Sequence, residues 1–127
     1  MRRKLIPILI PAMCAAAVFL LLRFFFLVGY VPTESMEPTL EKGSYILGKR
    51  IFSELETGDI VIFEHEGKLL VKRIAASPGE SIERNGVELI VPEDSYYMLG
   101  DNAANSYDSR FWSEPFIVRT CIKAKLV

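Results

Sequence analysis

This sequence has very little cysteine and histidine, the residues on which disulfide frameworks, zinc sites and histidine-based catalysis depend. Its 127 residues include two cysteines and one histidine. Two cysteines exclude a disulfide-stapled miniprotein and a four-cysteine zinc site, and Cys14 lies in an apolar segment far from Cys121. His65 stands at the start of a predicted hairpin turn and is a poor candidate for a catalytic triad. We therefore expect neither a metal nor a cofactor.

The sequence also lacks an excess of positive charge. Its formal net charge is −1, which argues against a nucleic-acid partner held by bulk positive charge. Residues 1–29 carry a charge of +4 and no acid, whereas residues 30–127 carry −5. A cationic apolar head joined to an acidic body is typical of a membrane-anchored extracytoplasmic domain.

A long apolar run follows the basic N-terminus. From Leu5 to Leu22 there are 18 residues without a charge, which as a helix span about 27 Å. The hydrocarbon core of a bilayer is about 30 Å thick. Arg23 interrupts the run, which then continues to Val28, and Tyr30 can act as an aromatic anchor at the interface.

A cleaved secretory signal peptide is the competing interpretation of this run, since Ala15-Ala16-Ala17 offers small residues for cleavage. The chain stays apolar after the alanines, which leaves no polar exit, so we favour an anchor. Residues 1–29 are then the cytoplasmic start and transmembrane anchor. The basic start places the N-terminus in the cytoplasm and residues 30–127 outside the plasma membrane.

The body is rich in turn signals and has no long stretch of helical periodicity. Asn85-Gly86 is a strong two-residue hairpin signal. The sequence predicts a mainly β fold, a compact antiparallel coiled sheet or partial barrel behind one transmembrane helix. The expected strands are Ser44–Leu47, Asp59–Glu64, Leu69–Ala76, Ser81–Arg84, Val87–Val91, Ser95–Leu99 and Phe116–Val127.

Ser35 lies between two prolines, Pro32 and Pro38, directly after the apolar run. Each proline fixes its own backbone, and Pro38 also restricts the residue before it, so the local backbone is stiff. A stiff loop presents a hydroxyl and its own N–H group in a fixed geometry, as a nucleophile requires. A plain loop serine has the same local pattern, so this segment alone leaves both interpretations open.

Lys72 lies between Leu70 and Ile74 on one face of a predicted strand, and Arg73 points to the opposite face. If that face covers the core, burial disfavours the ammonium form and lowers the pKa of Lys72. A lysine with the ordinary pKa of about 10.4 is neutral in only about one part in two thousand at pH 7. The alternative is an edge-strand lysine that guards against aggregation.

The segment Gly100–Trp112 is too polar for a strand. We expect Asp101 and Asp108 to clamp Arg110, and Ser106 to exchange a hydrogen bond with a nearby amine. The alternative is a surface turn with an exposed salt bridge.

Four segments of the body are more specific together than apart. They are Ser-Met-Glu-Pro-Thr-Leu (residues 35–40), Gly-Asp-Ile-Val-Ile-Phe (58–63), Val-Lys-Arg-Ile-Ala-Ala-Ser-Pro-Gly-Glu (71–80) and Gly-Asp-Asn-Ala-Ala-Asn-Ser-Tyr-Asp-Ser-Arg-Phe-Trp (100–112). In this order, behind a single apolar anchor, they resemble the type I signal peptidases. One departure is Ser113, where that family usually has glycine.

The resemblance implies a membrane-bound serine endopeptidase that removes N-terminal signal peptides from exported preproteins with a serine–lysine dyad. It places Ser35 at the nucleophile, Lys72 at the general base, and Ser106 at the hydroxyl that orients the lysine. Thr33 falls where the family often has an oxyanion-hole hydroxyl. The family's structural charge cluster corresponds to Asp101, Asp108 and Arg110. The microsomal branch has histidine at the position of Lys72, so the resemblance is to the bacterial or organellar branch.

The expected partners are therefore preprotein signal peptides and the lipid bilayer, without nucleic acid or metal. Many members of the family carry an inserted second domain, for which residues 30–127 leave no room, so we expect a minimal catalytic domain. Two alternatives remain open. One is a catalytically silent, membrane-anchored binding module, and the other is a specialised peptidase for a pilin or conjugation substrate.

Overall fold

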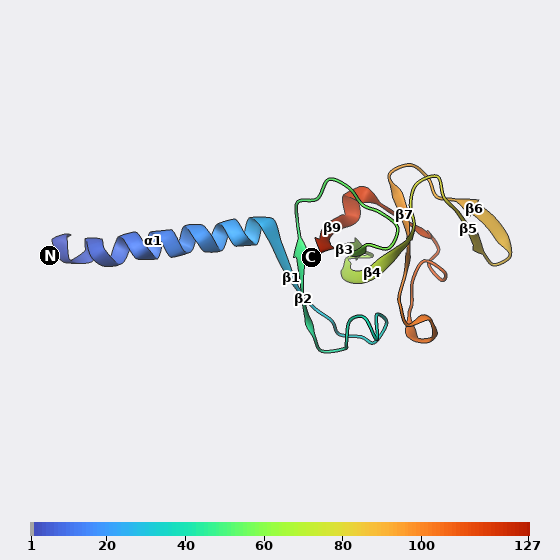
Figure 1. Cartoon of the computed structure of the whole chain (residues 1–127), viewed down its shortest axis with the longest axis horizontal. Coiled ribbons are helices and arrows are strands. Elements are labelled where there is room, and N and C mark those ends of the chain that lie inside the picture. The colour runs from blue at the N-terminus through green and yellow to red at the C-terminus, as the bar shows by residue number, and fades with distance from the viewer. Residues whose placement is uncertain (1) are drawn as a thin grey trace.

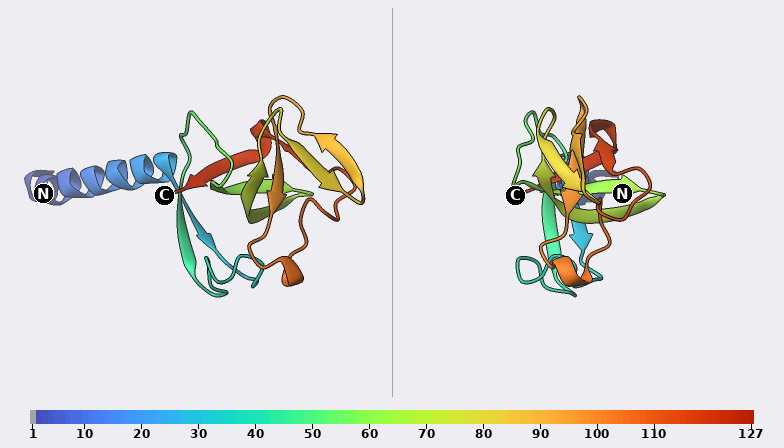
Figure 2. Two further views of the ribbon diagram at one scale, coloured as in Figure 1. Left: turned by 45° about the vertical axis from the view of Figure 1, so that its right-hand side comes forward. Right: turned by 90° about the vertical axis from the view of Figure 1, so that its right-hand side faces the viewer.

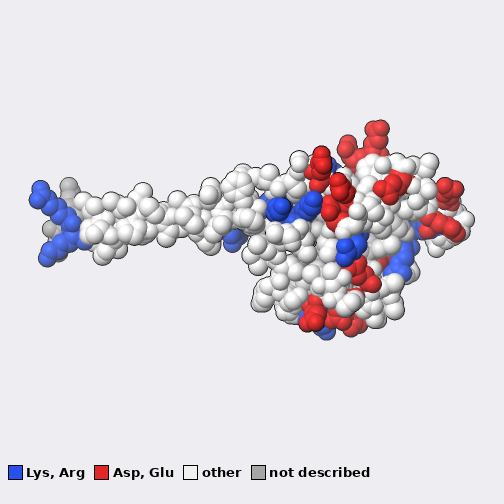
Figure 3. All heavy atoms as spheres, in the orientation of Figure 1, with Lys and Arg blue, Asp and Glu red and all other residues white. Residues whose placement is uncertain are grey.

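A single long helix extends away from a small β-rich body (Figure 1). The computed structural model describes residues 2–127. Helix α1 (Arg2–Phe25) is long and apolar enough over Arg3–Phe25 to cross a membrane, as the sequence predicts. Figure 3 shows most of this helix, after its first residues, as a stretch without charged side chains. Arg23 lies in its last turn.

The helix ends earlier than the apolar run does. Residues 26–29, which the sequence groups with the anchor, lie in strand β1 (Phe26–Tyr30). This strand pairs antiparallel with β2 (Tyr45–Lys49), from Phe26 opposite Lys49 to Tyr30 opposite Tyr45. Aromatic and β-branched residues favour strands, and Leu27 packs against a buried cluster that includes Ile46 and Ile62. Strand pairing and this packing together end the helix at Phe25.

The body is an open antiparallel sheet of seven strands in the order β1-β2-β9-β3-β4-β7-β8, with a separate hairpin of β5 and β6. The predicted fold class is confirmed. Figure 2 shows strands that cross at steep angles instead of lying in one flat layer. The remaining strands are β3 (Ile60–His65), β4 (Lys68–Ala76), β5 (Ser81–Arg84), β6 (Val87–Ile90), β7 (Ser95–Leu99), β8 (Phe116–Val118) and β9 (Ile122–Leu126).

Two predicted hairpin turns are present. Glu66 and Gly67 join β3 to β4 with φ values of 50° and 76°, and Asn85 and Gly86 join β5 to β6 with φ values of 54° and 78°. Positive φ at both central residues is the signature of the turn whose twist matches that of paired strands. The first turn fixes the register that places Lys72 opposite Val61.

The prediction of one strand over Phe116–Val127 is wrong. The 3-10 turn Arg119–Cys121 divides it into β8, which pairs with β7, and β9, which pairs with β2 and β3. The residues on both sides of the turn are apolar, so the hydrophobic pattern has no break there. The backbone bends where the N–H of Arg119 donates to the carbonyl of Asp94.

The main core lies against β3, β4 and β7 and contains Phe63, Ile74, Met98 and Trp112. Strand β4 pairs with β7 only through the stretch from Arg73 to Ala76. The edge of residues 68–72 that faces away from β3 therefore has no strand partner among the described residues. The loop between β1 and β2, which contains Ser35, comes close to this free edge.

Candidate active site

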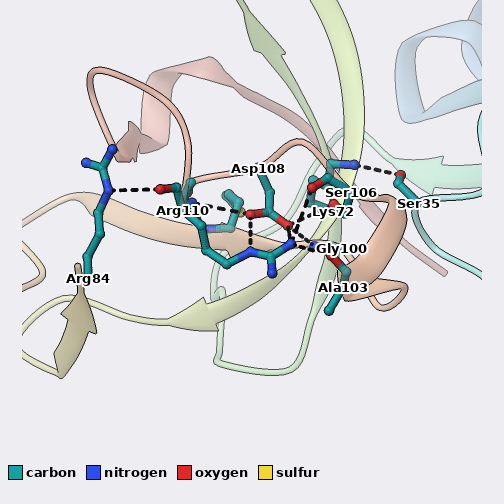
Figure 4. Close-up of polar contacts among 10 residues, drawn as sticks. Ser35, Lys72, Arg84, Gly100, Ala103, Ser106, Asp108 and Arg110 are labelled. Atoms are coloured by element: carbon teal, nitrogen blue, oxygen red, sulfur yellow. Dashed lines mark hydrogen bonds and ion pairs between the residues drawn. The ribbon is translucent and has the colours of Figure 1, made fainter. Parts of the chain in front are cut away.

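Ser35 and Lys72 are in direct contact, although they are far apart in the sequence. Lys72 Nζ donates a hydrogen bond of 2.6 Å to Ser35 Oγ (Figure 4). Ser35 comes from the loop after β1, and Lys72 from the middle of β4. Their residues are 6% and 5% exposed, respectively. The fold therefore brings together the two residues that the sequence singles out, in a site shielded from bulk water.

The environment of Lys72 favours its neutral form. Burial lowers the pKa of the amine, the negative charge of Asp108 opposes this shift, and the positive charge of Arg110 adds to it. The net direction is downward because desolvation is the largest of the three effects. The alternative of an exposed edge-strand lysine is wrong, since this side chain faces the same side of β4 as the fully buried Ile74.

Thr33 lies beside the serine, where its Oγ1 donates a hydrogen bond of 3.2 Å to Ser35 Oγ. The backbone N–H of Ser35 has no acceptor among residues 2–127. A free N–H group and a hydroxyl therefore flank the Ser35 oxygen, which is the donor set that an oxyanion hole needs.

Asp108 is fully buried and collects donors from three sides (Figure 4). Ser106 Oγ donates to it at 2.8 Å, the N–H of Gly100 at 3.0 Å, and Arg110 Nε at 2.8 Å. Burial alone would raise the pKa of Asp108, but the hydrogen bonds from Arg110, Gly100 and Ser106 together hold it below its usual value. The predicted pairing of Asp108 with Arg110 is confirmed.

The hydrogen bond that Ser106 donates is accepted by Asp108, not by Lys72. Its effect on the amine is therefore indirect in this structure, because it stabilises the carboxylate whose charge acts on Lys72.

Asp101 does not clamp Arg110, and this expectation is corrected. It binds Arg73 through two hydrogen bonds of 2.8 and 2.7 Å, and it accepts a third, of 2.5 Å, from Thr39. The hydrogen bonds from Arg73 are the main cause of the lowered pKa of Asp101. Strand alternation predicts that the Arg73 side chain lies on the face of β4 opposite to Lys72. It does not predict which residue accepts the hydrogen bonds of Arg73. Asp101 thus ties β4 to the loop of the serine.

Two further residues hold the Ser35 loop, and no local sequence pattern indicates either role. The N–H of Asn102 donates to the carbonyl of Ser35 at 2.8 Å, and its side chain donates to the carbonyl of Glu34 at 3.1 Å. Gly100 lies so close that a Cβ there would overlap both the Ser106 hydroxyl and the Ser35 carbonyl oxygen. A glycine at this position is what lets the 100–112 loop approach the serine.

Two cavities border the Ser35–Lys72 pair. The smaller, of about 70 Å³, lies between residues 30–36 and 69–72. The larger, of about 360 Å³, extends from the pair to the end of the β3–β4 hairpin. His65 lines its wall as the last residue of β3, not at the tip of the turn, and stacks on Trp112 with ring centroids 4.0 Å apart. Among residues 2–127 no group of three or more histidine, cysteine or acidic side chains is gathered to hold a metal.

The chain matches the family model described as signal peptidase, peptidase S26, over residues 2–91 and 84–127. It belongs to this family. A probable signal peptidase I-1 of Synechocystis is 32% identical in an alignment 144 positions long, which covers 84% of this chain and 72% of that protein. A signal peptidase I of Leptolyngbya laminosa is 31% identical over 119 residues, which cover 65% of this chain and 59% of that protein.

Some similar proteins are named as inactive. An inactive signal peptidase IA of Staphylococcus aureus is 33% identical over 84 residues, which cover 63% of this chain and 48% of that protein. The matched regions thus span between about half and three quarters of these relatives. Membership of the family therefore does not by itself establish catalysis, which has to be argued from the residues of this chain.

Proposed function

We propose that this protein is a membrane-anchored serine endopeptidase that removes signal peptides from exported preproteins with Ser35 and Lys72 as its catalytic dyad. The observation that carries the proposal is the buried contact of 2.6 Å between the amine and the hydroxyl. The inactive relatives favour a second candidate, a silent binding module, but such a module does not require a buried amine of lowered pKa in contact with a serine hydroxyl.

The reaction follows from the protonation state of Lys72. The neutral amine accepts the Ser35 proton as Oγ attacks the carbonyl carbon of the scissile peptide bond. The ammonium then protonates the departing amine of the mature protein, which leaves the signal peptide as an ester on Ser35. Water attacks this ester with Lys72 again as base, and the signal peptide leaves with a free carboxylate. No metal or histidine takes part.

The transition state places negative charge on the oxygen of the attacked carbonyl. The N–H of Ser35 and the hydroxyl of Thr33 are the donors proposed to stabilise it. We expect Thr33→Val to lower kcat by about 10²-fold, as loss of one oxyanion donor commonly does, with KM nearly unchanged. Thr33→Ser keeps the hydroxyl and is the matched control, expected to stay within a few-fold of wild type. An equal loss in both variants would assign Thr33 a packing role.

The substrate can enter as an additional strand. Residues 68–72 of β4 offer an unpaired edge that ends at Lys72, and an extended peptide can hydrogen-bond to it on the side opposite β3. The cavity of about 70 Å³ beside Ser35 suits a small side chain better than a large one. The cavity supports the small residues that the family prefers at its cleavage site, and the free edge supports an extended substrate.

The direct test is cleavage of a preprotein by the purified full chain, followed by mass spectrometry of both products. We expect one cut after a small residue, and no product with Ser35→Ala, which removes a single oxygen from the site. Binding of the preprotein without cleavage by the wild type would support the silent module. Cleavage confined to one pilin or conjugation substrate would support the dedicated peptidase.

The placement of the chain is part of the proposal. Helix α1 would cross the plasma membrane once, with its basic start in the cytoplasm and residues 30–127 on the extracytoplasmic side. The apolar helix and the signal peptidase family support anchoring, and the charge difference between the two ends supports this orientation.

A further inference from the structure

A groove with a volume of about 460 Å³ lies where helix α1 meets strands β1 and β2. Its apolar lining includes Phe19, Leu22, Val28 and Leu47. Val28 and Leu47 lie opposite each other in the β1–β2 register and are 68% and 44% exposed. Exposed apolar side chains gathered in one hollow indicate a binding surface. No residue of this groove belongs to the Ser35–Lys72 site.

Two arginines line the same groove, Arg23 from the helix and Arg50 from the end of β2. The backbone N–H of Arg50 donates to the carbonyl of Phe25 at 2.8 Å, and its Nε donates to the carbonyl of Phe26 at 3.0 Å. These bonds hold Arg50 at the end of the helix, while its two Nη groups have no acceptor among residues 2–127.

Neither arginine has a counter-charge within the chain. No carboxylate of the described residues lies within 4 Å of the Arg23 or the Arg50 guanidinium, whereas Arg73 and Arg110 each pair with an aspartate. The Arg23 guanidinium lies 5.9 Å from the Phe19 ring, so it borders the apolar wall. The groove therefore combines an apolar lining with two arginines that have no counter-charge among the described residues.

We propose that this groove binds one anionic phospholipid of the outer leaflet, with its phosphate on Arg23 and Arg50 and an acyl chain along the apolar lining. Guanidinium groups bind phosphate oxygens with paired hydrogen bonds. Arg23 follows 18 uncharged residues, a helical rise of about 27 Å from the basic start, which sets it at the depth of lipid headgroups. This inference rests on the membrane anchoring proposed above.

The two cations decide between a lipid and other occupants. An apolar transmembrane segment of a partner protein would cover Val28 and Leu47 but leave both guanidinium groups without a counter-charge in a poorly hydrated place. A free phosphate would neutralise the cations but leave the apolar lining uncovered. An anionic phospholipid satisfies both parts at once.

The test is native mass spectrometry of the full chain, released from detergent with phosphatidylglycerol or phosphatidylcholine of the same acyl chains. We expect one phosphatidylglycerol to be retained in preference to phosphatidylcholine. Arg23→Gln and Arg50→Gln should each weaken its binding about fivefold, the effect of one basic residue at an anionic surface. Lys123→Gln removes the same charge from β9, away from the groove, and should leave binding unchanged.

The Arg23 side chain makes no hydrogen bond to any of residues 2–127, so Arg23→Gln is informative even if Arg50→Gln disturbs the helix end. Equal retention of the two lipids by the wild type, or equal effects of all three substitutions, would overturn the lipid site. Inorganic phosphate tested without lipid is a further check. If it binds the wild type and the two arginine variants weaken its binding as they weaken that of phosphatidylglycerol, the lipid site is overturned as well. Preprotein cleavage in detergent is measured in parallel, so that loss of lipid selectivity with intact cleavage refutes this site and not the peptidase.

Discussion

Lys72→Met should abolish cleavage while the folded state becomes more stable. The substitution keeps the length and most of the volume of the side chain but removes the amine that lies 2.6 Å from Ser35 Oγ. Loss of a member of a nucleophile–base pair commonly costs about 10⁴-fold or more in kcat. Removing a group whose charged form is disfavoured by burial should raise the free energy of unfolding by about 0.5–2 kcal/mol.

The pH dependence of stability gives the sign of the second effect. The pKa of Lys72 is lower in the folded than in the unfolded chain, so between these two values only the unfolded chain holds the proton. Wild-type stability therefore rises with pH through this window. The advantage of Lys72→Met should be largest below the window and disappear above about pH 10.4.

Urea unfolding at several pH values measures the stability, and preprotein cleavage measures the rate. The wild type should also show a pH–rate profile with a rising limb whose midpoint lies below 10.4, as a depressed lysine pKa requires. Appreciable cleavage by Lys72→Met would remove the lysine from the mechanism. A destabilised variant would show that the side chain is needed for packing and not mainly for chemistry.

Asp108→Ala should destabilise the body by about 2–4 kcal/mol. The carboxylate is fully buried and accepts from Gly100 and Ser106, whose donors would then be left buried without a partner. Arg110 is one-third exposed and can turn to water, so the loss of its partner adds little to the destabilisation. Cleavage should fall as well, because the same loop holds the carbonyl of Ser35 through Asn102.

Acid unfolding checks this assignment independently. The pKa of Asp108 is lowered in the folded chain, so its stabilising effect is complete above about pH 4 and is lost as the pH falls through its folded value. The acid-induced loss of stability should be smaller in Asp108→Ala. Part of it should remain, because the pKa of Asp101 is also lowered in the folded chain. Glu93→Ala, at an exposed position, is the matched control. A variant as stable as this control would place the support of the loop elsewhere.

The contact between Ser35 and Lys72 could be predicted, but the residues that hold this pair in place could not. Ser35 and Lys72 belong to short motifs, and strand alternation correctly places Lys72 on the buried face of β4. The partner of Arg73 depends on how a distant loop packs, so local pattern cannot assign Asp101 to it. The need for glycine at position 100 arises only when two loops meet.

The limits of hydrophobic pattern explain the errors in the fold. Apolar residues continue through Phe26, yet the backbone changes there from helix to strand because β2 offers a partner. They also continue on both sides of Arg119, where the chain leaves β8 at one edge of the sheet and returns as β9 between β2 and β3. Periodicity reports which side chains are buried, but it does not report against which strand.

The direct passage of helix α1 into strand β1 has a consequence for substrate selection. No connecting loop separates the helix from the sheet, so in the proposed membrane-anchored form the strand that continues directly from the helix sets the height of Ser35 above the bilayer. A polypeptide must then present its scissile bond at that same height. The length of its own apolar segment would then determine whether the scissile bond of a polypeptide reaches the Ser35–Lys72 pair.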